Sequence, residues 1–210
     1  MWHSFQGVTL TLLLDASLER IFSFCLLLSP ILRELIQHSN FPVAAGLLCG
    51  LGLGGFFDGI LLHQVLQWHH MLTSAGYPPD SVQNLQVNTR WDGLFHLSTY
   101  LCVLLGLLLL WRAAHRTHVR WSGKLLAGAM LIGFGLFNVV ECLMDHHLLG
   151  IHHVNETVPP AQWIYWDMTF LVWGALMLLG GWRLLRTGRQ ETARQLVEDR
   201  EASSAKRPSS

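Results

Sequence analysis

The sequence predicts an all-α integral membrane protein, with four transmembrane helices arranged as a two-plus-two pseudo-twofold repeat behind an N-terminal extension. Composition is the first reason, because 51% of the 210 residues are hydrophobic and only 13% are charged, unlike an average soluble domain. The second reason is that apolar residues fall in four runs, each close to the roughly 20 residues that cross the hydrocarbon of a bilayer. These runs are Val43–Leu66, Trp91–Trp111, Leu125–His146 and Trp163–Trp182.

A polar pattern that occurs twice is the third reason. Two stretches 83 positions apart both have the form acid-x4-His-x5-His-His, and both lie at the end of an apolar run. Carboxylates and imidazoles are costly in hydrocarbon, so their duplication indicates one site built from two related halves. The second and fourth runs support the repeat, because each has a Trp-Asp pair near its start, Trp91-Asp92 and Trp166-Asp167. The repeated residues are Asp58, His63, His69 and His70 in the first stretch, and Glu141, His146, His152 and His153 in the second.

The basic residues predict the orientation of the helices. Thirteen of the fourteen lie before the first run, between the second and third runs, or after the fourth, and Arg90 is the exception. By the positive-inside rule, both termini are cytoplasmic and the His-rich connections 67–90 and 147–162 face outward. Because these basic residues flank membrane spans, they give no indication of nucleic-acid binding.

The chain divides into three parts. Residues 1–40 contain the apolar segments Gly7–Leu14 and Ile21–Leu32, which are separated by charged residues, and we expect an interfacial helix or a poorly ordered extension. Residues 41–183 form the predicted four-helix membrane domain. Residues 184–210 are rich in charge and predict a cytoplasmic tail.

Helical geometry predicts where a site would form. At about 1.5 Å per residue, acids on all four spans reach a similar depth near the outer boundary of the hydrocarbon, and three spans add a histidine there. We predict that the inner ligands of the site are His63, His96, Glu141 and His146. Asp58, Asp92, Asp145 and Asp167 are predicted as further ligands or as partners that orient the ligands. His69, His70, His147, His152 and His153 are candidate outer ligands.

Two spacings within this set matter for the geometry. Asp92 and His96 are four residues apart and therefore share one face of a helix. Asp58 and His63 are five apart and diverge by about 140° around an ideal α-helix. Only one of these two would point into the bundle unless the helix is distorted.

Imidazole and carboxylate ligands without thiolates suit a transition metal: iron, manganese, zinc or copper. The number of histidines favours a dinuclear centre, or one ion whose ligands are held by further polar partners. Heme b is the alternative cofactor, because histidines on facing helices could supply two axial imidazoles. Two simpler interpretations stay open, since His-His pairs are often interfacial anchors and Asp92 with His96 can form a structural hydrogen bond.

The segment GLGGFFDGILLHQVLQWHHM, followed by RWDGLFH, resembles a family of predicted bacterial membrane proteins catalogued as a domain of unknown function. The resemblance covers about residues 43–183. It implies a multi-pass protein of the bacterial cytoplasmic (inner) membrane. Some members of that family occur fused to a cytochrome-oxidase assembly domain, which implies respiratory-chain or oxidase-assembly proteins as partners besides the lipid bilayer.

Three functions are consistent with these observations. The first is a membrane protein with a metal site at its outer, periplasmic face, acting as a metal-dependent oxidoreductase or a respiratory-chain-related factor. The second is a heme-b electron carrier, and the third is a protein that captures and delivers metal ions. The sequence leaves open which metal binds, whether the protein is an enzyme and what its oligomeric state is.

Overall fold

The computed structural model describes residues 41–117 and 119–205, so the predicted extension at residues 1–40 lies outside the described residues. The elements in chain order are α2 (Val43–Phe56), the π-helix η1 (Phe57–Val65), α3 (Val82–Ala114), α4 (Gly123–Glu141), the π-helix η2 (Cys142–Leu148), the 3-10 helix η3 (Pro160–Gln162) and α5 (Trp163–Ala205). Every regular element in this part of the chain is helical, which confirms the predicted fold class.

Two serines define where long helices begin. The Ser81 hydroxyl accepts a hydrogen bond from the Asn84 N–H at the start of α3, and the Ser122 hydroxyl accepts one from the Leu125 N–H at the start of α4. Both are N-caps, which satisfy backbone donors that a helix leaves free in its first turn. α3 therefore starts at Val82, before the apolar run that predicted it.

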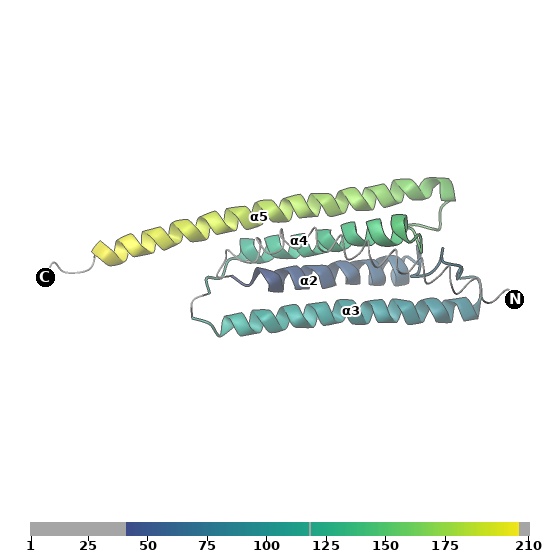
Figure 1. The fold of residues 1–210 in the computed structure, drawn as a ribbon, viewed down its shortest axis with the longest axis horizontal. Helices are drawn as coiled ribbons and strands as arrows, with labels where there is room; N and C mark the ends of the chain where they lie inside the picture. Colours follow the sequence, from purple (N-terminus) through teal and green to yellow (C-terminus); the bar gives the residue numbers. More distant parts are fainter. Residues whose placement is uncertain (1–40, 118, 206–210) are drawn as a thin grey trace.

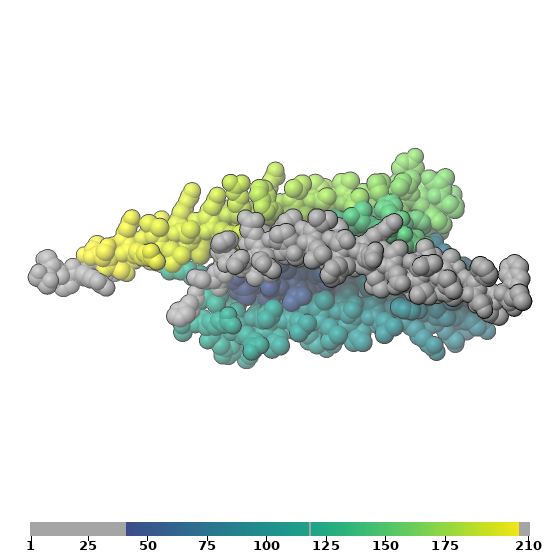
Figure 2. Space-filling view, viewed as in Figure 1, coloured from purple at the N-terminus to yellow at the C-terminus, as the bar shows by residue number. Residues whose placement is uncertain are grey.

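The helices lie side by side in the order α3, α2, α4, α5 (Figure 1). α2 and α4 form the inner pair. In the apolar stretches of their spans, 56% and 50% of the residues are buried, whereas the corresponding shares for the spans of α3 and α5 are 11% and 22%. Figure 2 shows α3 and α5 along the two long edges of the molecule. Leu101, Leu105 and Leu108 on α3 are exposed, as expected for a surface in contact with lipid.

Four helical segments of the described chain are long and apolar enough to cross a membrane: Val43–Val65, Val82–Ala114, Gly123–Leu148 and Pro160–Ala205. They contain most of the four predicted runs, so the predicted number and order of spans are confirmed. α5 continues through the predicted tail without a break as far as Ala205.

Glycines allow the inner helices to approach closely. A Cβ added to Gly50 would lie 2.0 Å from the carbonyl oxygen of Met130, and one added to Gly133 would lie 2.1 Å from that of Leu47. These two contacts are related by the same shift of 83 positions as the polar pattern. The repeat is therefore a symmetry of backbone packing as well as of sequence, and small residues make it possible.

The outer helices follow the repeat with a shift of 75 positions. Gly106 on α3 packs against Ala45 on α2, and Gly181 on α5 packs against Gly128 on α4 in the same way. The two Trp-Asp pairs of the sequence are also 75 positions apart. The second repeat therefore has the shorter connection between its two helices.

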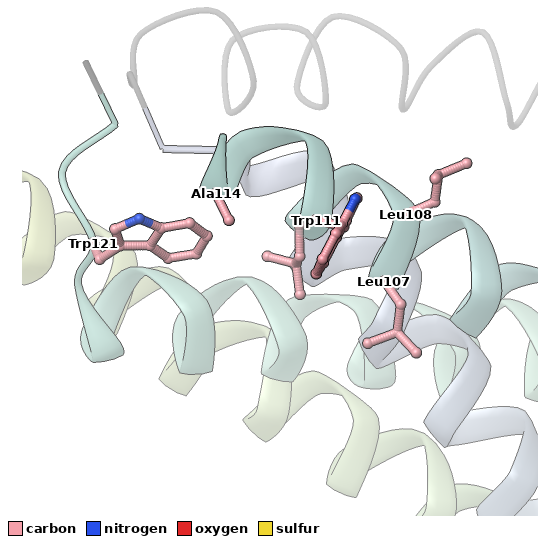
Figure 3. A pocket seen from close by; sticks show the side chains of 6 residues that line it. Leu107, Leu108, Trp111, Ala114 and Trp121 are labelled. Atoms are coloured by element: carbon pink, nitrogen blue, oxygen red, sulfur yellow. The ribbon is translucent and has the colours of Figure 1, made fainter. Parts of the chain in front are cut away.

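An open apolar hollow lies at the C-terminal end of α3, and its lining consists of Leu107, Leu108, Leu110, Trp111, Ala114 and Trp121 (Figure 3). The indoles of Trp111 and Trp121 are both exposed. Tryptophans are enriched where membrane helices meet the lipid headgroups, so this end of the bundle has the character of a membrane interface.

Gly181→Ala should destabilise the fold, because the added methyl group would lie 2.7 Å from the carbonyl oxygen of Gly128. α4 and α5 would have to separate, and overpacking of this kind costs about 1–3 kcal/mol. Gly180→Ala is the matched control, since it adds the same group with no atom within 4 Å. Thermal unfolding in detergent should show a lower midpoint for Gly181→Ala alone, and equal midpoints for both variants would contradict the close approach of α4 and α5.

Candidate metal centre

Both inner helices widen into π-helices at the same end of the bundle. At the end of η1 the backbone N–H of Leu66 donates to the carbonyl oxygen of Leu61, and at the end of η2 the N–H of Leu149 donates to that of Met144. These bonds span five residues instead of four, which is the definition of a π-helix and is frequent at functional sites. One turn of such a helix brings residues i and i+5 to the same face.

This change of helix type places the acid and the first histidine of each pattern together. Asp58 Oδ2 lies 2.9 Å from His63 Nε2, and Glu141 Oε1 lies 3.0 Å from His146 Nε2. All four side chains are buried. The distortion that the five-residue spacing requires is thus present in both halves.

A residue with positive φ follows each π-helix and turns the chain. These residues are Gln67, with φ of 50°, and Gly150, with φ of 58°, and they too are 83 positions apart. Positive φ is uncommon for a residue other than glycine, so Gln67 marks an imposed turn. Because the chain turns here, the helix ends before His69 and His152, and both of these side chains fold back into the bundle, where they are almost fully buried.

Six side chains meet at this end of the bundle. Their ligand-type atoms form three overlapping trios, and within each trio the atoms lie within 4.8 Å of one another. The trios are His63, His69 and His152; Glu141, His146 and His152; and Asp58, His69 and Glu141. None of the six residues is more than 6% exposed. We refer to these six residues as the central cluster.

The imidazoles of His63 and His146 are held from behind by carboxylates on the outer helices. His63 Nδ1 donates to Asp92 Oδ1 at 2.9 Å, and His146 Nδ1 lies 3.2 Å from Asp167 Oδ1. Each carboxylate also binds the loop next to it: Asp92 accepts the N–H of Met71, and Asp167 accepts that of Val154. Carboxylates in this position fix the orientation of a metal-binding imidazole and raise its basicity.

The imidazoles of His69 and His152 are held by the backbone of the opposite loop. His69 Nδ1 donates to the carbonyl oxygen of Val154 at 2.9 Å, and His152 Nδ1 donates to that of Met71 at 3.1 Å. A carbonyl oxygen can only accept, so in both rings Nδ1 carries a proton, and Nε2 faces the cluster. Each repeat therefore orients a histidine of the other.

These outward bonds leave imidazole Nε2 atoms and carboxylate oxygens facing one another inside the cluster. Nε2 of His146 and Nε2 of His152 each lie 3.0 Å from the same oxygen, Glu141 Oε1. Asp58 Oδ1, His69 Nε2 and Glu141 Oε2 are buried and have no hydrogen-bond partner among the described residues. Lone pairs and carboxylate charges this close need positive charge between them, because burial without a partner is costly.

The protonation of His69 fits a ligand. Burial, together with the nearby imidazoles of His152 and His63, holds the pKa of His69 well below its usual range. His69 is therefore neutral at physiological pH, and the neutral imidazole is the form that binds a metal ion.

The other predicted residues have different positions. His70 and His153 are partly exposed. His70 Nδ1 lies 3.1 Å from Asp92 Oδ2, and His153 Nδ1 lies 2.7 Å from Asp167 Oδ2. His147 is exposed. Asp145 is partly buried beside the cluster but belongs to none of the three trios.

His96 is the predicted inner ligand that the structure does not bring into the cluster. Its ring stacks on Phe56 with 6.2 Å between centroids, and its Nε2 lies against Gly59. His96 was predicted as a ligand because it shares a helix face with Asp92. In the structure Asp92 binds His63 and His70, whereas His96 packs against Phe56 and Gly59. His69 and His152, predicted as outer ligands, occupy the central cluster instead.

The fold and the cluster together define a class: a multi-pass membrane protein with a buried His/carboxylate cluster at one end of its helices. The chain belongs to the family described as "Predicted membrane protein (DUF2243)", which it matches over residues 45–188. That range includes both repeats, and the resemblance noted in the sequence is confirmed. Neither a curated protein nor a solved structure matches the chain.

Asp92→Asn should weaken metal binding without removing a ligand. The neutral amide keeps the size of the side chain but loses the charge that orients His63, and changes of this kind typically reduce metal affinity about 10–100-fold. Asp167→Asn should act in the same way on His146. Asp80→Asn is the control, because Asp80 is exposed and its Oδ1 accepts only from Asn84 Nδ2 among the described contacts. Metal titration of the purified variants would measure this, and wild-type affinity in Asp92→Asn would contradict the role of that carboxylate.

Proposed function

We propose that the protein is a membrane metalloprotein with a resident dinuclear transition-metal centre, which serves a metal-dependent oxidation–reduction reaction. The central cluster supplies four imidazoles and two carboxylates and no thiolate. Such a set suits iron, manganese, copper or zinc, and facing helices of a bundle are a common frame for dinuclear carboxylate centres.

The convergence of buried acceptors is the observation that carries the proposal. In the described residues no lysine or arginine belongs to the cluster, while several of its nitrogen and oxygen lone pairs face inward without a partner. A metal cation would satisfy these lone pairs directly. The Nδ1 bonds support the same conclusion, because they direct the Nε2 atoms of these histidines into the cluster, where they can bind an ion.

Two ions explain the ligand set better than one. Glu141 belongs to two of the three trios, and a carboxylate can bridge two neighbouring ions. The shift of 83 positions also gives each repeat one acid and two histidines in the cluster. A symmetric pair of ions matches this duplication.

The geometry disfavours the alternative of heme b. The rings of His69 and His152 are stacked 4.5 Å apart, and those of His63 and His69 are 4.3 Å apart. A porphyrin between two axial imidazoles needs a flat space free of other side chains, which these rings fill.

The burial of the ligands favours a resident centre over delivery of metal ions. A delivery protein must release its cargo, whereas the imidazoles of the cluster are held from behind by carboxylates and backbone carbonyls. Partners that fix ligands in this way increase metal affinity. His147 and the partly exposed His70 and His153 are the residues that a delivery function would use instead.

His146→Ala should remove most of the bound metal, and His147→Ala should leave it in place. The two residues are adjacent, but His146 is 3% exposed and in the cluster, whereas His147 is exposed. His63→Ala should act like His146→Ala, and the double variant should do little further harm because the ligands work as a unit.

Elemental analysis and a visible spectrum of the detergent-purified protein would measure these effects. We expect two transition-metal ions per chain and no Soret band. Stoichiometric metal in His146→Ala would refute the centre, a Soret band would favour the heme carrier, and metal that a mild chelator removes would favour delivery.

We also propose that the cluster lies at the outer, periplasmic face of the bacterial inner membrane, with both termini in the cytoplasm. The distribution of basic residues supports this orientation. Respiratory-chain or oxidase-assembly proteins are the proposed partners.

Cysteine labelling tests the orientation. Asp80 and Ser203 are exposed, Asp80 just before the start of α3 and Ser203 near the end of α5. These two helix ends lie at opposite ends of the molecule (Figure 1). Asp80→Cys should react with an impermeant maleimide in intact spheroplasts, and Ser203→Cys should react only after permeabilisation, both relative to the parent chain. The reverse pattern would place the cluster in the cytoplasm.

A further inference from the structure

An apolar pocket of about 230 Å³ lies between η1 and α5, beside the central cluster. Its lining consists of three tryptophans, two phenylalanines, three leucines, Val154 and Thr169. The hydroxyl of Thr169 donates to the carbonyl oxygen of Tyr165 within α5. The pocket therefore offers no charged group for recognition, and its lining suits hydrocarbon.

The inner wall of the pocket is also the wall of the cluster. Leu62 and Phe170 are 4% and 5% exposed and line the pocket. Leu62 directly precedes His63, and the ring of Phe170 lies 6.1 Å from that of His146. Val154 completes this wall, and its carbonyl oxygen is the one that binds His69. An occupant would thus be separated from the metal ligands by a single layer of side chains.

The position of the pocket indicates the source of the occupant. Its lining follows η1 from Phe57 to Leu66 and α5 from Trp166 to Trp173, so it runs along the helices. Both segments lie largely within candidate membrane spans, where the surroundings are lipid chains parallel to the helices. Its volume exceeds that of an engineered 150 Å³ cavity that binds benzene, so it is large enough for part of an alkyl chain.

The pocket also breaks the symmetry of the repeat. Positions that correspond to Leu62 and Trp68 by the shift of 83 hold Asp145 and Ile151, and the one that corresponds to Trp173 by the shift of 75 holds Ser98. The ligands are duplicated, as are Trp166 and Phe170, which correspond to Trp91 and Phe95, but the other three aromatic residues of the lining are not. A feature that only one half retains is expected where the halves serve different roles.

We propose that this pocket binds an alkyl chain supplied by the bilayer and holds it against the His146 side of the centre. The inference rests on the proposed function, and it makes alkyl-chain compounds dissolved in the membrane the class of molecule that the centre receives. The tryptophans form the walls, with Trp68 and Trp166 in contact at 5.0 Å between ring centroids.

Photolabelling of the full chain in phosphatidylcholine vesicles tests the proposal, with a fatty acid that carries a diazirine on its alkyl chain as the probe. Label mapped by mass spectrometry should be enriched at Leu62 and Phe170 over lipid-facing Leu101, Leu105 and Leu108. Leu66→Trp should remove most of this label, because Leu66 lines the pocket and is 41% exposed. The matched control is Leu149→Trp at the symmetry-related position, which is 39% exposed and does not line the pocket.

Metal content measured on the same samples separates the two proposals. Label confined to exposed positions, or unchanged by Leu66→Trp in a variant that keeps wild-type metal content, would refute the alkyl site and leave the metal centre standing. Enriched label in a wild-type protein without metal would refute the proposed function, and with it the role of the pocket as access to a metal.

Discussion

The contact of two imidazole nitrogens with one carboxylate oxygen of Glu141 is the constraint on which the rest of the structure depends. In water such groups would be solvated separately, but here they lie inside an apolar bundle where unpaired charge is costly. The cluster is stable only if positive charge lies among the acceptors. The bonds behind the ligands, from Asp92, Asp167 and two backbone carbonyls, keep the lone pairs directed at that position.

The internal repeat explains how so many polar groups can be buried together. The backbone contact of Gly50 with Met130 recurs as that of Gly133 with Leu47, so α2 and α4 are related by a pseudo-twofold axis between them. A residue near such an axis meets its own counterpart. An acid and a histidine at the same depth on both helices therefore lie together in one doubled ligand set, and glycine packing brings the two halves close enough to share it.

The sequence predicts the spans and the depth of the site more completely than the identity of its ligands. Hydropathy and the positions of acids depend on local composition, which is readable residue by residue. The choice between His96 and His69 depends on backbone geometry instead. His63 follows Asp58 by five positions, a spacing that suits a π-helix. Nothing in the sequence predicts the positive φ of Gln67, which turns the chain so that His69 points inward. The equivalent Gly150 was the only available signal for that turn.

Symmetric ligands in unequal surroundings give the centre two different sides. On the side of α5, Leu62 and Phe170 separate the ligands from an apolar pocket. On the other side, the position that corresponds to Leu62 is Asp145, a partly buried carboxylate. One side therefore lies against an apolar pocket, and the other has a carboxylate beside the ligands. Two metal ions with matching ligands would then differ in what can reach them, so the division of roles between them would come from these neighbouring residues and not from the ligands.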